Sequence, residues 1–157
     1  MPPGSTLLFG AIPNQTKFSP AEKRALAVFA RTLSARLAHG RPFTCLIADD
    51  SELRRLNCGF LGNDYPTDVL SFPSQQAAGD LGDIAVSVER AEQQAREFGH
   101  SRQAEICILM LHGLLHLTGM DHERDAGEMA RAERRWRGQL GLPANLLARS
   151  AQTVTAR

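Results

Sequence analysis

The sequence lacks a hydrophobic run long enough to span a bilayer. Its longest apolar-rich stretch, Ile106 to Leu117, contains two histidines and is shorter than the ~20 residues that a spanning helix needs. The first ten residues also lack the basic segment and long apolar core of a secretory signal. We therefore expect a soluble cytoplasmic protein without membrane association.

Cysteine is scarce and the net charge is small. The three cysteines, Cys45, Cys58 and Cys107, are scattered and odd in number, which argues against a disulfide scaffold and for a reducing compartment. Two of them lie in apolar runs, where a buried thiol is expected. A net charge of +1 gives no electrostatic signal for nucleic acid and none against it.

The 157 residues fit one domain (1–157), and a hydrophobic content of 43% supports a core. The order of β-prone runs and amphipathic segments predicts an α+β fold, in which a small mixed central sheet of about four strands packs with about five helices. Residues 144–157 are expected to form a frayed tail. The expected strands are 6–11, 43–48, 68–72 and 81–86, the last two pairing antiparallel across a connector. The expected helices begin after Ser19, in the region 49–51, after Ser87, after Ser101 and at about Glu123, with a loop at 59–64.

The stretch from His112 to His122 reads H-x-x-x-H-x-x-G-x-x-H. His112 and His116 are four residues apart and share one face of a helix. Gly119 is suited to end that helix in the left-handed conformation, so that the chain turns back and brings His122 to the same point. Zinc accepts three histidine nitrogens and keeps a fourth position for water in catalytic sites. The sequence therefore predicts one zinc ion held by His112, His116 and His122, at the end of a helix whose apolar centre indicates burial.

Other interpretations of these histidines stay open. They could be unrelated, or they could hold a structural zinc, although such sites usually have four protein ligands and no cysteine lies in the motif. Zinc peptidases share the spacing, but they place a general-base glutamate directly after the first histidine. Gly113 occupies that position and cannot accept a proton, so peptide hydrolysis ranks below other metal-assisted reactions. A metal that contacts an anionic phosphodiester gives weak support for phosphodiester hydrolysis.

Charged residues near the motif have two readings each. Asp121 either accepts the far N–H of a metal-bound histidine and relays a proton, or it is a turn residue. The arginines of the last helix are expected to form a solvated face paired with glutamates. These arginines are Arg131, Arg134, Arg135 and Arg137, and the glutamates are Glu123, Glu128 and Glu133.

The segment from Glu105 to His122, which contains HGLLHLTGMDH, resembles the signature of the YbeY family of bacterial endoribonucleases that mature ribosomal RNA. Leu56-Asn57 with PTDVLSFP at 66–73, and LGDI at 81–84 followed by Ser87, resemble two further family blocks. The resemblance covers residues from about 50 to 123. It implies an α+β fold, one zinc at His112, His116 and His122, and cleavage of single-stranded RNA. The implied role is small-subunit rRNA maturation and ribosome quality control, with ribosomal RNA, the ribosome or small-subunit proteins as partners and no DNA.

One position departs from the family pattern. The family usually has an arginine between the Leu-Asn and Pro-Thr-Asp blocks, where this chain has Leu61. Arginine clamps a phosphate through two parallel hydrogen bonds and leucine has no such groups. Either a nearby arginine (Arg54, Arg55 or Arg102) substitutes, or RNA cleavage is weaker. A zinc-dependent endoribonuclease is the leading hypothesis. A zinc metallopeptidase-like hydrolase and a ribosome-associated binding protein with a mainly structural zinc are the alternatives.

Overall fold

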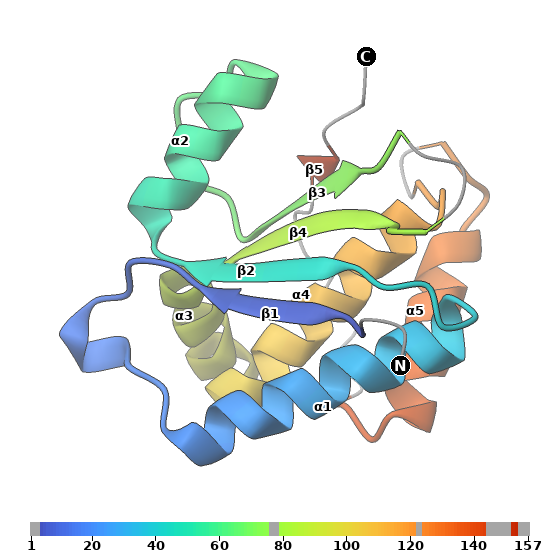
Figure 1. Cartoon of the computed structure of the whole chain (residues 1–157), viewed down its shortest axis with the longest axis horizontal. Helices are drawn as coiled ribbons and strands as arrows, with labels where there is room; N and C mark the ends of the chain where they lie inside the picture. Colours follow the sequence, from blue (N-terminus) through green and yellow to red (C-terminus); the bar gives the residue numbers. More distant parts are fainter. Residues whose placement is uncertain (1–3, 76–78, 122–123, 144–151, 154–157) are drawn as a thin grey trace.

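The protein consists of a mixed β-sheet with helices on both sides (Figure 1). The computed structural model describes residues 4–75, 79–121, 124–143 and 152–153. The strands are β1 (Thr6–Phe9), β2 (Thr44–Ala48), β3 (Val69–Pro73), β4 (Gly82–Ser87) and β5 (Gln152–Thr153). The helices are a 3-10 turn at Asn14–Thr16 and α1 (Pro20–Leu37), α2 (Asp50–Leu61), α3 (Val88–Phe98), α4 (Arg102–Leu117) and α5 (Glu128–Gln139). The expected α+β class is confirmed.

The strand order in the sheet is β1-β2-β4-β3-β5. β1, β2 and β4 run parallel, whereas β3 pairs antiparallel with β4, as the sequence predicted for these two segments. The two-residue β5 adds a parallel partner to β3 within the segment that was expected to be a frayed tail. The rest of that tail, 144–151 and 154–157, lies outside the described residues.

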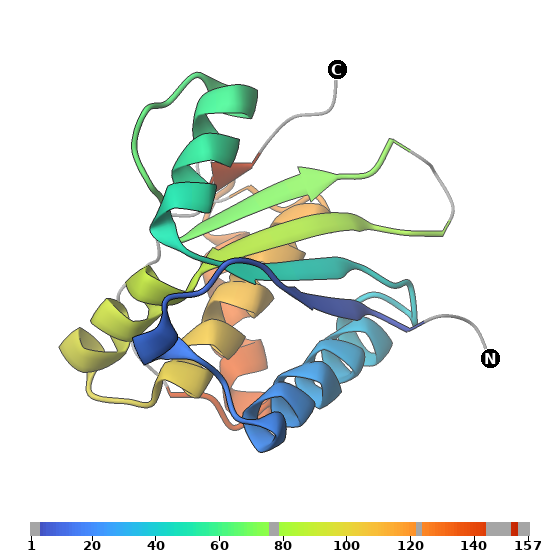
Figure 2. The same ribbon diagram turned by 60° about the vertical axis from the view of Figure 1, so that its left-hand side comes forward.

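The two faces of the sheet have different cover. α1, α3, α4 and α5 lie on one face, and α2 lies on the other, beside β3 and β4 (Figures 1 and 2). Alternate residues of β4 follow this division: Ile84 and Val86 belong to the main core, and Ala85 belongs to the small cluster beneath α2, because successive strand side chains point to opposite faces. The main core therefore lies between the sheet and the four-helix side.

Local capping sets most of the helix boundaries. Ser19 and Glu22 form the predicted capping box of α1, and Asp49, Ser87 and Ser101 cap the next three helices. The sequence placed the end of α2 too early, since it continues through Gly59 to Leu61 before Gly62 turns left-handed (φ 73°). Phe60, which the sequence predicts in a loop, lies in the last turn of α2 and is 60% exposed.

The start of α5 was also predicted wrongly. The helix begins at Glu128 and not at about Glu123, which lies outside the described residues. The Asp125 carboxylate accepts hydrogen bonds from the N–H groups of Gly127 (2.8 Å) and Met129 (2.9 Å), and Gly127 adopts a left-handed φ of 92°. This local turn satisfies the first helical donors and delays the helix. Within the described ranges, no helix has the length and apolar character needed to cross a membrane.

Candidate metal centre

α4 is the buried helix of the molecule, as predicted. All residues from Glu105 to Leu117 are buried, and the helix packs against β3, β4, α1, α3 and α5. A helix surrounded on every side holds its side chains in fixed rotamers, because the interior is close-packed. The two histidines near its C-terminal end, His112 and His116, are therefore presented from a rigid support.

Gly113 allows α4 to lie directly on the sheet. A Cβ atom at this position would lie 2.9 Å from Cγ2 of Ile84 on β4 and 3.2 Å from Oγ of Ser71 on β3. The Ser71 hydroxyl also donates a 3.0 Å hydrogen bond to the Gly113 carbonyl. The position that carries the base in zinc peptidases thus points into the sheet and has no room for a glutamate. The packing at position 113 is therefore a steric argument against the peptidase hypothesis.

The end of α4 forms the turn that the sequence predicted at Gly119. Gly119 has a φ of 99°, its N–H donates to the His116 carbonyl (3.0 Å), and the Met120 N–H donates to Leu115 (3.1 Å). This pair of bonds is the Schellman arrangement, which satisfies the last helical carbonyls and reverses the chain. The chain that follows the turn is thereby directed back along the helix end.

His112 and His116 lie one turn apart with ring centroids 5.0 Å from each other. Their exposed fractions are 3% and 6%, so both imidazoles lie inside the molecule next to the helix end. Neutral imidazole nitrogens at this spacing suit a zinc ion, which binds histidine at ~2.0–2.1 Å. The donors that the structure describes therefore fit the predicted metal.

The third predicted ligand, His122, lies outside the described residues. Within the described part of the chain, no group of three His, Cys, Asp or Glu side chains is arranged as a metal site. Asp121 is half-buried and lies 3.7 Å from the Arg124 guanidinium (Oδ2 to Nε), and its carbonyl accepts from the Arg124 N–H. These contacts fit the turn reading of Asp121, whose part in metal binding remains a prediction.

The carboxylate next to the histidine pair belongs to Glu133 of α5. Its Oε1 lies 2.9 Å from Nδ1 of His112 and 3.3 Å from Nη2 of Arg137. A carboxylate beside Nδ1 favours the tautomer with its proton there, so that Nε2 becomes the nitrogen that binds metal. Glu133 therefore does not lie on the solvated face that the sequence predicts for it. Its position among the inward residues Met129, Ala132 and Trp136 was the signal that could have identified it.

Opposing effects act on the Glu133 carboxyl. Burial raises its pKa, but the hydrogen bonds from His112 and Arg137 and the charge of Arg137 outweigh burial, and the pKa lies below its ordinary value. The carboxylate is therefore kept ionised. An ionised Glu133 holds the His112 ring through a charge-assisted hydrogen bond.

The cysteines take no part in this site. Cys45 and Cys107 are buried in the main core, and burial raises the pKa of each thiol to about 12. A protonated thiol is neither a nucleophile nor a metal ligand at neutral pH. This agrees with the expectation that two of the three cysteines are inert, buried thiols.

The arginines of α5 do not form the ion-paired face that the sequence predicted. Arg137 is buried and pairs with Glu133. Arg131, Arg134 and Arg135 are exposed, and none of them has an ion pair within the described residues. Three of the four arginines are therefore solvated as predicted, whereas Arg137 is buried; pairing with a glutamate is found for Arg137, and pairing with Glu123 lies outside the described residues.

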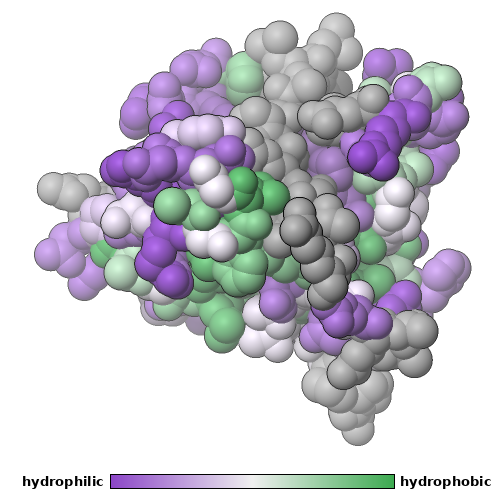
Figure 3. Space-filling model, turned by 90° about the horizontal axis from the view of Figure 1, so that it is seen from above, coloured by the Kyte–Doolittle hydropathy of each residue, from purple (hydrophilic) through white to green (hydrophobic). Residues whose placement is uncertain are grey.

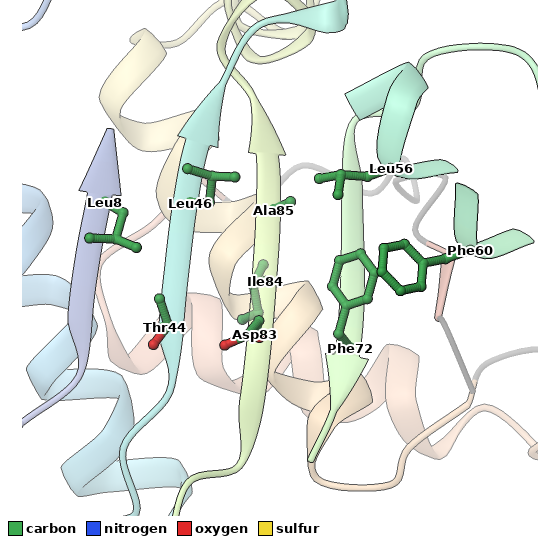
Figure 4. A pocket seen from close by; sticks show the side chains of 9 residues that line it. All are labelled: Leu8, Thr44, Leu46, Leu56, Phe60, Phe72, Asp83, Ile84 and Ala85. Atoms are coloured by element: carbon green, nitrogen blue, oxygen red, sulfur yellow. The ribbon is translucent and has the colours of Figure 1, made fainter. Parts of the chain in front are cut away.

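The far face of the sheet carries an open apolar groove of about 320 Å³ beside α2. Leu8, Leu46 and Ala85 line it from three strands, and Phe60 of α2 meets Phe72 of β3 edge to face, with ring centroids 5.2 Å apart. Figure 4 shows these side chains above the strands, and hydrophobic surface is visible next to α2 from above (Figure 3). Leu61 is half-buried and packs on the neighbouring cluster with Leu70. Leu61 thus has a packing role in place of phosphate binding.

The fold and the site together describe an α+β protein with a helix-borne histidine pair oriented by a buried carboxylate. Residues 12–141 match the family model described as "Endoribonuclease YbeY". The chain is 54% identical over 148 residues to the endoribonuclease YbeY of Solibacter usitatus, covering 94% of this chain and 96% of that protein. It is 42% identical to the one from Koribacter versatilis, covering 87% and 89%. The chain belongs to the YbeY family, which confirms the resemblance drawn from the sequence motifs.

A solved structure supports the fold independently. The solution structure of TM1509 from Thermotoga maritima superimposes with a TM-score of 0.58 over 86% of this chain and 91% of that one. The sequence identity is 24%, so this likeness concerns the fold alone.

Proposed function

We propose that this chain is a zinc-dependent endoribonuclease that cleaves single-stranded RNA during the maturation of small-subunit ribosomal RNA. The family membership supports RNA as the substrate. The observation that carries the metal dependence is the buried pair His112 and His116, with Glu133 on Nδ1 of His112. We further propose that the protein acts in the cytoplasm, on ribosomal RNA in ribosomes or small-subunit precursors, and in ribosome quality control.

The residues of the site have separate tasks in this proposal. His112 and His116, with His122 as the third ligand, hold the zinc, and Glu133 fixes the orientation of His112. Bound zinc supplies a water of lowered pKa and polarises a phosphoryl oxygen. Gly113 provides no base, so the proton of the attacking water passes to a group other than the side chain at that position. Asp121 stays a candidate for this relay.

Purified protein tests the proposal directly. Zinc-loaded wild type should cut a single-stranded RNA and leave its duplex intact, and a chelator should abolish the cutting until zinc is restored. His116→Ala should remain folded by circular dichroism and lose zinc and activity, because one of three nitrogen ligands is removed.

His39→Asn is the matched control. His39 is an exposed histidine in the left-handed region (φ 52°), and asparagine tolerates this backbone conformation. The His39→Asn variant should therefore retain full activity. Cleavage that persists in the chelator, or zinc-loaded wild type that cuts no RNA, would overturn the proposed function.

A further inference from the structure

One face of α5 carries three exposed arginines. Arg131, Arg134 and Arg135 follow one another at i, i+3 and i+4, so they are neighbours on the helix surface. Met129, Ala132, Glu133 and Arg137 are buried on the opposite side. We call Arg131, Arg134 and Arg135 the arginine row. It extends over about 6 Å of helix axis, since each residue adds ~1.5 Å.

The row is not neutralised by carboxylates in the described residues. Arg131 donates a 3.2 Å hydrogen bond to the Ala126 carbonyl, and the exposed acid of α5, Glu128, accepts from the Ala126 N–H. Like charges at this spacing destabilise a helix. Three adjacent guanidinium groups therefore repel one another and leave their charge directed to solvent, where an anionic ligand would relieve the repulsion.

Arginines elsewhere in the molecule are engaged differently. The three candidates for the missing family arginine each have a carboxylate partner: Arg54 with Asp64 (2.8 Å), Arg55 with Glu52 (2.6 Å) and Arg102 with Glu22 (3.1 Å). Each of the three therefore has a carboxylate within ion-pair distance. Within the described residues, Arg131, Arg134 and Arg135 have no carboxylate at that distance.

The row lies on the helix that supports the metal centre. Glu133 stands between Arg131 and Arg134 in sequence and contacts Nδ1 of His112 from the other side of α5. At the far end of the helix, Arg36 of α1 lies over the Trp136 ring (5.5 Å) and donates to Gln139 (3.3 Å). Arg36 thus adds a further positive charge beside the C-terminal half of α5.

We propose that the arginine row binds the sugar–phosphate backbone of the single-stranded RNA outside the metal centre, on the solvent face of α5. This inference rests on the proposed function, because it takes RNA as the ligand. Guanidinium groups bind phosphate oxygens through paired, charge-assisted hydrogen bonds. Contacts of this kind give affinity without reading base identity.

The test is the binding of a fluorescently labelled, single-stranded RNA to the zinc-loaded full chain, measured by anisotropy over a range of salt concentrations. The RNA carries phosphorothioate linkages, which keep the backbone charge and slow cleavage, and it is confirmed intact on a gel after each titration. The variant Arg131→Gln/Arg134→Gln/Arg135→Gln removes the row but keeps good helix formers. The control, Lys17→Gln/Arg24→Gln/Arg96→Gln, removes three exposed charges: one from the residue that follows the 3-10 turn, one from the first half of α1 and one from α3.

The row variant should raise Kd by at least about tenfold at 0.1 M salt. The slope of its log Kd against log salt concentration should be smaller by about 2, since each phosphate contact to a single strand contributes ~0.7 to that slope. The control should keep the wild-type slope. A row variant with the wild-type Kd and slope, or a control with the same loss, would overturn the inference. Row-dependent binding by a wild type that never cleaves would support the row and overturn the proposed function, so the two failures are distinguishable.

Discussion

At the scale of single residues, the decisive contact is the one between Glu133 and His112. Their side chains meet at 2.9 Å although they are 21 residues apart. Carboxylates that hold a metal-bound histidine fix the ring and raise its basicity. Arg137 contacts the same carboxylate from the next turn of α5. A buried triad of this kind orients the first predicted ligand before any metal arrives.

Removal of the Glu133 charge should weaken metal binding. We expect Glu133→Gln to lower zinc affinity by about 10–100-fold, because the orienting partner loses its charge. Competition with a chromophoric chelator measures the affinity, and thermal melting confirms that the variant is folded. Glu128→Gln makes the same charge change at an exposed position of the same helix and should bind zinc as wild type does. Equal affinity for both variants would contradict the orienting role.

At the scale of elements, the approach of α4 to the sheet depends on Gly113. The helix lies against β3 and β4 so closely that a methyl group meets the β-branched side chain of Ile84, which has little rotamer freedom. Glycine inside a helix is ordinarily a weakness, because it is ~1 kcal/mol less favourable than alanine. Here close packing outweighs propensity.

Two glycine substitutions separate these effects. Gly113→Ala should destabilise the protein by about 1–2 kcal/mol, since overpacking of a filled core exceeds the gain in propensity. Gly138→Ala on α5 meets nothing within 4 Å and should stabilise by about 0.5–1 kcal/mol. Urea denaturation of both variants measures the free energies of unfolding. A Gly113→Ala protein as stable as Gly138→Ala would show that α4 can shift away from the sheet.

At the scale of the whole molecule, long-range polar contacts tie the N-terminal segment to the metal helix. Arg102, at the start of α4, donates to the Thr16 carbonyl (2.8 Å) and to Glu22 (3.1 Å), and it lies 4.1 Å from the Phe18 ring centroid. Glu22 completes the α1 capping box at the same time. One carboxylate thus serves a local cap and a contact 80 residues away in sequence.

The stability of the molecule should depend on pH through Glu22. The Ser19 backbone N–H lowers the pKa of this carboxyl most in the folded protein; burial opposes this effect, and Arg102 and the Ser19 hydroxyl lower the pKa further. A lowered folded-state pKa means that Glu22 contributes its full stability above its unfolded pKa of ~4.3 and loses it as the pH falls through the folded value. Glu22→Gln should therefore lower Tm at pH 7, and the deficit should shrink towards pH 3.

Melting curves of wild type and variant between pH 7 and pH 3 check this prediction. Glu97→Gln, an exposed glutamate of α3, should have a Tm close to wild type throughout. A Tm deficit of Glu22→Gln that stays constant down to pH 3 would mean that Glu22 acts through packing and not through its charge.

The sequence by itself determined the features that depend on neighbours three or four residues away. The cap at Ser19, the turn at Gly119 and the shared face of His112 and His116 follow from hydrogen bonds and spacing within one helical turn. The boundaries of α2 and α5 were predicted less well, because Gly59 was tolerated inside a helix and Asp125 formed a turn of its own. The position of a helix boundary depends on which of several local hydrogen bonds of similar strength forms.

Only the tertiary structure decided which partners meet across the chain. The contact of Glu133 with His112, the steric closure at Gly113, and the carboxylate pairing of Arg54, Arg55 and Arg102 each depend on how helices and strands pack. The same packing left Arg131, Arg134 and Arg135 exposed. A charged residue has the same local pattern whether it is solvated, paired or buried, and the distinction comes from the surfaces that folding brings against it.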